Sequence, residues 1–185
     1  YDTAIGVVTY RWFADDPDGD ETIISAEMRW NDGDWYEIDP QQPLVTFVAD
    51  TNSVDEAVIY YGNSSFEQPN KINGFKRNQE NTLYLRVRDI ADAFSPVDTS
   101  QTVFIKEPGS KFLVISGQPT SVTQVYQPIL GNLGLSYDFL DFGANGGEFQ
   151  PKFWNPTFRL LLMQYEEAFV YTDASLFNNA ATGQN

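Results

Sequence analysis

The sequence predicts a two-part protein: an antiparallel β-sandwich over residues 1–108, followed by a partial α/β domain with a parallel sheet over residues 109–185. Three observations support this prediction. Short segments of roughly two-residue apolar period fill the first part, and turn residues separate them at intervals of about eight to twelve positions. Pro108-Gly109-Ser110 has the composition of a linker. Beyond it, apolar runs alternate with helical periodicity, as in β-α-β units.

The first two expected strands flank an acidic turn. Apolar residues recur at about every second position over 7–13 and again over 23–30, which is the period of a half-buried strand. Between them, Pro17 presets the first corner of a turn and Gly19 supplies a positive φ. We therefore expect a hairpin or another strand-to-strand connection at this turn.

The same turn is rich in carboxylates, namely Asp15, Asp16, Asp18, Asp20 and Glu21. Calcium prefers several oxygen ligands on a chain that turns sharply, so a calcium site is a hypothesis for this segment. An EF-hand is a poor match, because strands rather than helices flank the loop. The favoured interpretation is a solvated acidic turn, since Asp and Gly are common in turns.

The next elements follow from alternation and turn residues. The dipeptide Asp32-Gly33 is a hairpin signal, and it precedes a strand expected over 35–38. Further strands are expected over 44–48, 57–61, 82–89 and 102–105. The polar stretch 62–81 between them is expected to be a long loop or an insertion.

Four motifs of this part carry a resemblance to a known family: YRWFADDPDGDE, RWNDGDWYEI, TLYLRVRDIADAFSPV and TVFI. They resemble the immunoglobulin-like or fibronectin type III-like modules of bacterial surface and secreted proteins. Such modules have a Trp before a DPDGD turn, a second Trp after a short hairpin, and an alternating strand followed by a Ser-Pro turn. The resemblance covers residues 5–106. It implies an immunoglobulin-like antiparallel sandwich outside the cell and says little about function.

Four aromatic residues in this part have two interpretations: Trp12, Trp30, Trp35 and Tyr84. An aromatic row on an exposed sheet face can stack sugar rings, as in carbohydrate-binding modules. The favoured alternative is that Trp12 and one of the hairpin tryptophans fill the core, since buried Trp is a regular component of such sandwiches.

The second part begins with a continuous apolar run over 112–116, as expected for a strand that is covered on both faces. Ser121 and Gln124 have the spacing of a capping box and predict the start of a helix. Pro128 is expected to kink or shorten this helix. Its apolar face is expected to contain Val122, Val125, Tyr126, Ile129, Leu130 and Leu133.

Two more strands and a helix complete the expected pattern. The strands are expected over 137–142 and 168–172, and Asn155-Pro156 predicts the start of the helix between them. This order implies a parallel sheet with right-handed crossovers. It resembles the start of a flavodoxin-like or glutamine-amidotransferase-like domain. Because only three strands fit, we expect the domain to be completed by further sequence or by another chain.

Ligands of open α/β sheets bind at the carboxyl ends of the strands. Here those ends are expected to present Ser116, Gly117, Asp141 and Asp173. The two Asp residues could form a carboxylate pair or hold magnesium, although Asp at a strand end is more often a turn or cap residue. No dinucleotide fingerprint and no P-loop follows the first strand.

Composition excludes several classes of function. The chain contains no Cys and no His, so disulfides, thiolate nucleophiles, His-based catalysis and the Cys-His chemistry of amidotransferases are excluded. We therefore expect no enzymatic activity in this chain and no cofactor other than a possible calcium ion. The net charge is −15, of which −12 belongs to residues 1–108, so nucleic acids and anionic membranes are disfavoured as partners.

The chain shows no apolar run of about 18 residues and no signal segment, so direct membrane insertion is not expected. The leading hypothesis is a non-enzymatic extracellular or cell-surface structural or adhesion module of a larger bacterial protein or assembly. Its partners would be proteins or other domains of the same protein. The alternative is the non-catalytic front part of a secreted hydrolase that binds polysaccharide. A third hypothesis is a subunit of a surface or secretion assembly.

Overall fold

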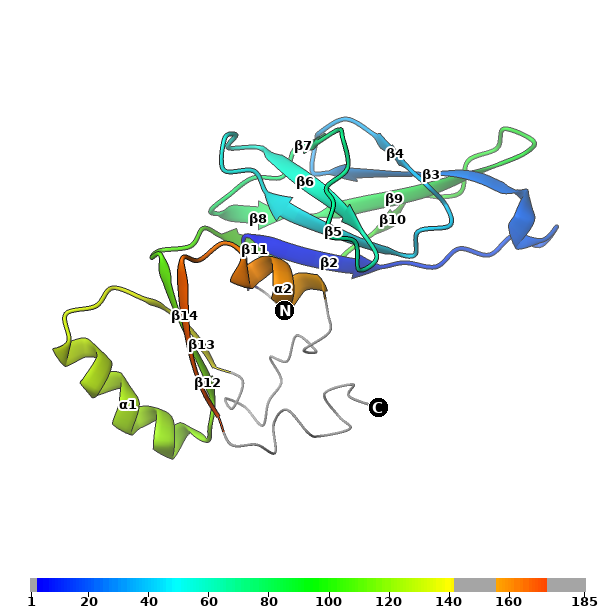
Figure 1. The fold of residues 1–185 in the computed structure, drawn as a ribbon. Coiled ribbons are helices and arrows are strands. Elements are labelled where there is room, and N and C mark those ends of the chain that lie inside the picture. The colour runs from blue at the N-terminus through cyan, green and yellow to red at the C-terminus, as the bar shows by residue number, and fades with distance from the viewer. Residues whose placement is uncertain (1–2, 142–155, 173–185) are drawn as a thin grey trace. The chain divides into compact units, whose positions relative to one another are not determined.

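The computed structural model describes residues 3–141 and 156–172. The chain divides into two compact units, Tyr1–Glu107 and Pro108–Asn185. Most strand pairs of the first unit are antiparallel, and the sheet of the second unit is parallel (Figure 1). The expectation of antiparallel sheets followed by one parallel sheet is therefore confirmed.

The described residues of the first unit form three sheets. Two have four strands each, in the orders β10-β9-β3-β4 and β2-β5-β6-β7, and a three-stranded sheet has the order β1-β11-β8. The strands are β1 (Thr3–Ile5), β2 (Val7–Arg11), β3 (Ile23–Trp30), β4 (Tyr36–Ile38), β5 (Leu44–Ala49), β6 (Glu56–Tyr61), β7 (Ile72–Asn73), β8 (Gln79–Asn81), β9 (Leu83–Asp89), β10 (Asp98–Thr99) and β11 (Val103–Lys106).

The acidic turn connects strands of different sheets. The backbone N–H of Gly19 donates to the oxygen of Asp16 at 2.9 Å, and Gly19 has a φ of 112°, so the predicted turn is present. A short 3-10 helix, η1 (Asp20–Thr22), follows it. However, β2 pairs with β5, whereas β3 pairs with β4 and β9. Of the two expected forms, the segment is therefore a connection between sheets and not a hairpin.

The predicted hairpin after β3 is confirmed, because β3 and β4 pair antiparallel. Its turn is also held from outside: the N–H of Asp34 donates to Oδ1 of Asn73 at 2.8 Å, and Nδ2 of Asn73 donates to the Asp34 carboxylate at 2.7 Å. A Cβ on Gly33 would lie 2.7 Å from Oδ1 of Asn73, so this close approach requires glycine.

The expectation of a long loop over 62–81 is wrong in part. This stretch contains β7, which pairs with β6, and β8, which pairs with β11. It also buries Phe75 and Asn81 completely. The amide of Asn81 donates to the backbone oxygens of Lys76 and Gln79 and accepts from the N–H of Lys76. One side chain thus satisfies backbone groups of Lys76 and Gln79 that a regular ladder would otherwise pair, and such an arrangement leaves no periodicity in the sequence.

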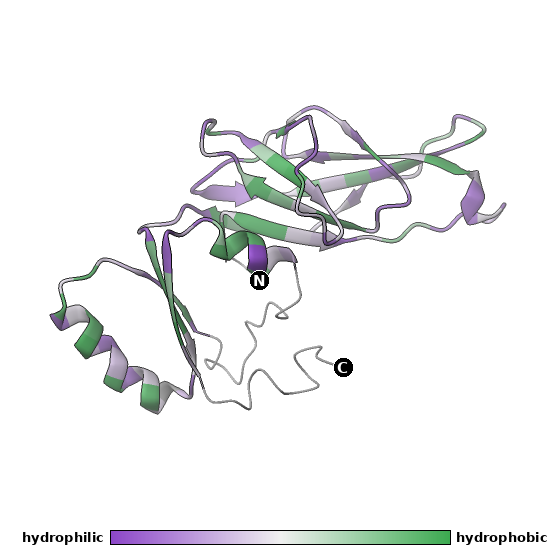
Figure 2. Cartoon of the chain, in the orientation of Figure 1, coloured by the Kyte–Doolittle hydropathy of each residue, from purple (hydrophilic) through white to green (hydrophobic). Residues whose placement is uncertain are grey.

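The core of the first unit contains side chains from both four-stranded sheets. Trp30 of β3 is fully buried, and its ring centroid lies 5.2 Å from that of Phe47 of β5 and 4.9 Å from that of Phe75. Both pairs meet edge to face, the arrangement that aromatic quadrupoles prefer. Figure 2 shows that β5 is hydrophobic along most of its length, whereas hydrophobic and hydrophilic residues alternate along β9. The prediction that one hairpin tryptophan fills the core is confirmed for Trp30.

The second unit is built on one buried strand. Its sheet has the order β13-β12-β14, and β12 is buried from Leu113 to Gly117, as its apolar run predicted. Two helices accompany the sheet in the described residues. The elements are β12 (Phe112–Gly117), α1 (Thr120–Asn132), β13 (Asp138–Asp141), α2 (Pro156–Leu162) and β14 (Glu167–Thr172). Asn155, the expected cap of α2, lies outside the described residues.

Helix α1 differs from its prediction in three respects. It begins at Thr120 after Pro119, without a side-chain cap, so the capping box at Ser121 is wrong. It continues through Pro128 to Asn132 and is therefore not shortened there. Of its expected apolar face, Leu130 is buried, whereas Val125, Ile129 and Leu133 are 61%, 53% and 64% exposed. Periodicity identifies residues that share a helix face, but it does not say what covers that face.

No helix within the described residues is both long enough and apolar enough to cross a membrane.

Candidate functional site

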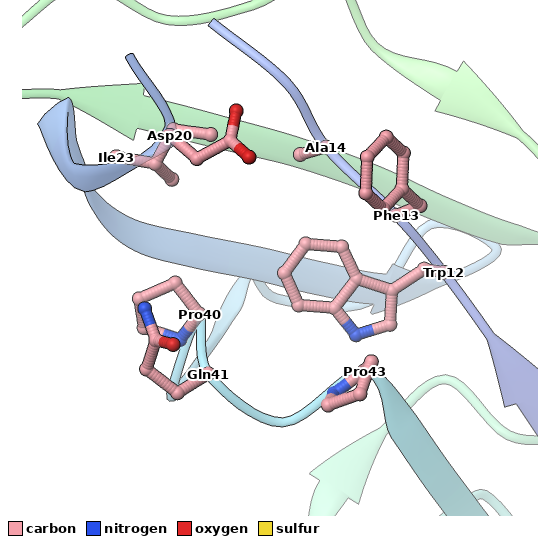
Figure 3. Close-up of a pocket in the computed structure, with 8 residues that line it drawn as sticks. All are labelled: Trp12, Phe13, Ala14, Asp20, Ile23, Pro40, Gln41 and Pro43. Carbon is pink, nitrogen blue, oxygen red and sulfur yellow. The ribbon is translucent and has the colours of Figure 1, made fainter.

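A pocket lies beside the acidic turn of the first unit, where the connection between β2 and β3 meets the connection between β4 and β5 (Figure 3). Its volume is about 210 Å³. It is lined by Trp12, Phe13, Ala14, Asp20, Ile23, Pro40, Gln41 and Pro43. The pocket therefore combines aromatic and proline walls with one carboxylate and one amide, and its volume is below the roughly 300 Å³ at which sites for drug-sized ligands begin.

The two aromatic residues of the pocket are held very differently. Trp12 is fixed at its backbone and at its ring: its backbone N–H donates to Pro43 O at 3.0 Å, and its indole Nε1 donates to Gln42 O at 2.8 Å. Its side chain is half-buried against the core. Phe13, in contrast, is 81% exposed. An exposed Phe next to a fixed Trp offers flat apolar area to a ligand.

Asp20 brings negative charge to the pocket. Figure 3 shows its carboxylate on the same side as Ala14, with Pro40, Gln41 and Pro43 on the other side of the Trp12 indole. No Lys or Arg is among the eight described residues that line the pocket. The Asp20 charge is therefore not neutralised by the pocket walls.

The acidic turn does not gather its carboxylates into a cage. Oδ1 of Asp16 accepts from the N–H of Asp18 at 2.8 Å, and Oδ1 of Asp20 accepts from the N–H of Asp16 at 3.4 Å. Asp15, Asp18, Asp20 and Glu21 are exposed. Within residues 3–141 and 156–172, no three acidic, His or Cys side chains are grouped so that they could hold a metal ion.

Glu27 stands at the twelfth position of a loop that is counted from Asp16, where an EF-hand has its bidentate ligand. In this chain Glu27 lies in β3 and pairs with Arg86 of β9, with 2.6 Å between Oε2 and the guanidinium. Its carboxylate is thus engaged by the neighbouring strand, which is a different arrangement from a calcium loop.

The β3–β9 face carries a stack of arginines and aromatic rings. The guanidinium of Arg29 lies 4.8 Å from the ring centroid of Trp35 and 5.0 Å from that of Tyr84. The guanidinium of Arg86 lies 4.3 Å from Trp35 and 4.1 Å from Phe94. The less favoured interpretation is a row of aromatic residues that stacks sugar rings. At Trp35 and Tyr84 the rings instead lie against arginine guanidinium groups. The pairing register of β3 and β9 would have indicated this stack, since it places Arg29 opposite Tyr84.

The structure places three of the four predicted strand-end residues of the α/β unit at one edge of its sheet. Ser116 of β12 is in register with Asp141 of β13, and Gly117 follows directly. Asp173 lies outside the described residues. Ser116 is fully buried, and its hydroxyl lies 2.7 Å from the hydroxyl of Thr123 in α1. This hydroxyl therefore joins the strand to the helix.

Sequence reasoning missed Asp138, which organises the start of the same unit. Its buried carboxylate accepts from the N–H groups of Gly109 and Ser110 at 2.7 and 3.2 Å and from the hydroxyl of Tyr165 at 3.0 Å. Burial, followed by the charge of Asp138, raises the pKa of Tyr165. No motif indicates this role, because the donors come from residues that are distant in sequence.

Neither a protein-family model nor a curated protein matches this chain. The functional interpretation therefore rests on the residues of the chain itself.

Proposed function

We propose that this chain is a non-enzymatic extracellular or cell-surface structural or adhesion module, formed by an immunoglobulin-like β-sandwich and a flavodoxin-like α/β unit. The observation that carries the proposal is the sheet order β10-β9-β3-β4, which shares an aromatic core with the β2-β5-β6-β7 sheet. Modules of this architecture commonly serve as spacers and recognition domains on cell surfaces.

Strand order supports the immunoglobulin-like assignment in one sheet. A G-F-C-C′ arrangement places the hairpin strands C and C′ beside two strands from the end of the domain, and β10-β9-β3-β4 has this order. The other sheet departs from the immunoglobulin order, because β5, the first strand after the hairpin, lies directly beside β2. The assignment therefore concerns the architecture more than the complete topology.

Strand order also supports the flavodoxin-like assignment of the second unit. The order β13-β12-β14 places the first strand between the second and the third, as at the start of the flavodoxin-like order 2-1-3-4-5. The same arrangement is compatible with a role as a subunit of a larger surface or secretion assembly.

The proposed partners are proteins or other domains of the same protein. The net charge of −15 disfavours binding to nucleic acids and to anionic membranes, because their phosphates would be repelled. Recognition through a protein surface also agrees with a chain that has neither Cys nor His for catalysis.

Protease treatment of intact source cells tests this proposal. An antibody against this chain should lose its signal when intact cells are treated with an added protease, while a cytoplasmic marker stays intact. Protection of the chain until the cells are lysed would contradict a surface location. In addition, catalytic turnover by the purified chain would contradict the non-enzymatic assignment.

A carbohydrate-binding role in a secreted hydrolase remains the second candidate, and the exposed ring of Phe13 beside Trp12 favours it. A sugar ring could stack on such a surface. Titration with soluble oligosaccharides tests this role. Binding should be lost in Phe13→Ala and retained in Phe66→Ala, which removes another exposed phenylalanine at a distant position in the sequence.

Calcium binding by the acidic turn is a separate hypothesis, motivated by the density of carboxylates. Asp16 and Asp20 already accept backbone hydrogen bonds, so we expect a bare solvated turn. The melting temperature of the chain should then be the same in calcium and in chelator. A rise of several degrees in calcium, absent from Asp18→Asn, would instead establish a site.

A further inference from the structure

The surroundings of one arginine, Arg86, contain the same kinds of groups as the pocket. Arg86 lies between the rings of Trp35 and Phe94, at 4.3 and 4.1 Å, and its guanidinium pairs with Glu27 at 2.6 Å. Two aromatic faces and one carboxylate thus hold one guanidinium. A planar, delocalised cation suits this environment, because it stacks on rings and donates hydrogen bonds in its own plane.

The pocket contains the same kinds of groups without the cation. Trp12 and Phe13 supply two aromatic rings, and Asp20 supplies a carboxylate at the same pocket. Phe13 is 81% exposed, so its ring is available to a ligand. No basic residue is present among the described residues of the lining.

The electrostatics around the pocket favour a positive ligand over a neutral one. Asp15, Asp16, Asp18 and Glu21 belong to the same turn as Asp20, and residues 1–108 carry a net charge of −12. A neutral sugar would gain only stacking and hydrogen bonds here, whereas a cation also gains the attraction of this acidic surface. Charge complementarity therefore distinguishes the two occupants.

We propose that this pocket binds an arginine side chain of a protein partner. The guanidinium stacks on Trp12 and Phe13 and donates to the Asp20 carboxylate. The proposal rests on the proposed function as a protein-binding module, and it names the chemistry that the partner presents.

Binding of short blocked peptides to the full chain tests the proposal. The probes are acetyl-Gly-Arg-Gly-amide and the same peptide with citrulline, a neutral isostere of arginine. The readout is the nuclear magnetic resonance signal of the Trp12 indole N–H. We expect the arginine peptide to shift this signal at millimolar concentration and the citrulline peptide to bind about tenfold more weakly or worse. Equal binding of the two peptides would overturn the proposal.

Two variants with the same charge change localise the effect. Asp20→Asn should weaken binding of the arginine peptide about fivefold, whereas Asp15→Asn, which alters the same turn outside the pocket lining, should weaken it less than about twofold. Equal losses would mean that only the diffuse acidic field attracts the peptide, and the proposal would fail. Phe13→Ala should also weaken binding. Because Phe13 is exposed, this variant is expected to keep the melting temperature of the parent chain.

The experiments separate this inference from the proposed function. An arginine peptide that binds at Trp12, in a chain that proves to be protected inside intact cells, would support the pocket and contradict the surface role. A surface-exposed chain whose Trp12 signal responds to oligosaccharides and not to the arginine peptide would overturn the inference and favour the carbohydrate-binding alternative.

Discussion

The two units of the chain cover their apolar residues to different degrees. In the first unit, Trp30, Phe47 and Phe75 are completely enclosed between strands of two sheets. In the second unit, β12 is buried, but Val125, Ile129 and Leu133 form an exposed apolar ridge along α1. Helix α1 also contains no charged residue. The aromatic core of the first unit is therefore enclosed, whereas the described part of the second unit buries β12, Leu130 and one side of α2 and leaves the ridge of α1 exposed.

The largest effect is expected from the core of the first unit. Trp30→Ala should destabilise that unit by about 3 to 5 kcal/mol, because it leaves a large cavity among fully buried rings. Trp35→Ala, its control on the outer face, should cost about 1 kcal/mol through the loss of cation–π contacts. Urea unfolding followed by circular dichroism measures both. If the two variants lost the same free energy of unfolding, Trp30 in the core would not contribute more to stability than Trp35 on the outer face.

The polar anchor of the second unit should give the next largest effect. Asp138→Asn should destabilise this unit by about 1 to 3 kcal/mol, because the N–H groups of Gly109 and Ser110 lose a charged acceptor. Tyr165→Phe removes only one of the three donors and should cost less. Both values come from the unfolding transition of the second unit. If Asp138→Asn leaves the free energy of unfolding unchanged, the carboxylate does not stabilise the unit.

A smaller, pH-dependent effect is expected in the first unit. Hydrogen bonding by Lys71, at 2.6 Å, holds the pKa of Asp50 below its ordinary value. Because the folded-state pKa is depressed, this pair contributes stability above the unfolded pKa of about 4, and the contribution is lost as the pH falls through the folded-state value.

Asp50→Asn should therefore reduce the acid dependence of stability below about pH 4, which unfolding curves between pH 2 and 7 would measure. If the stability of Asp50→Asn falls with pH below about pH 4 as steeply as that of the parent chain, the Asp50–Lys71 pair does not contribute to stability. Asp98→Asn, which removes an exposed carboxylate of β10, provides the control.

The smallest effect is expected on the ridge of α1. Ile129→Gln should change stability by less than about 0.5 kcal/mol, because this side chain is largely exposed. Its neighbour Leu130 is buried, so Leu130→Ala should cost at least about 2 kcal/mol. A large loss of unfolding free energy in Ile129→Gln would show that another surface covers the ridge in solution. The two units would then cover their apolar residues to a similar degree.

Local patterns in the sequence determined much of the secondary structure. The alternation in 23–30 and 82–89 predicted β3 and β9, and the apolar run over 112–116 predicted β12. These predictions succeed because side-chain period is a property of the strand itself. The acidic turn was likewise predictable, since Gly19 has the positive φ that glycine favours, and Asp32-Gly33 indicated the hairpin.

Only the tertiary structure decided which distant residues come together. The pocket unites Trp12 with Pro43, and Asp138 receives donors from Gly109 and Tyr165. The strands β7 and β8 form because the chain returns to β6 and β11. The physical reason is that a local pattern states which face of an element is apolar, whereas burial and hydrogen-bond partners depend on what the rest of the chain places against that face.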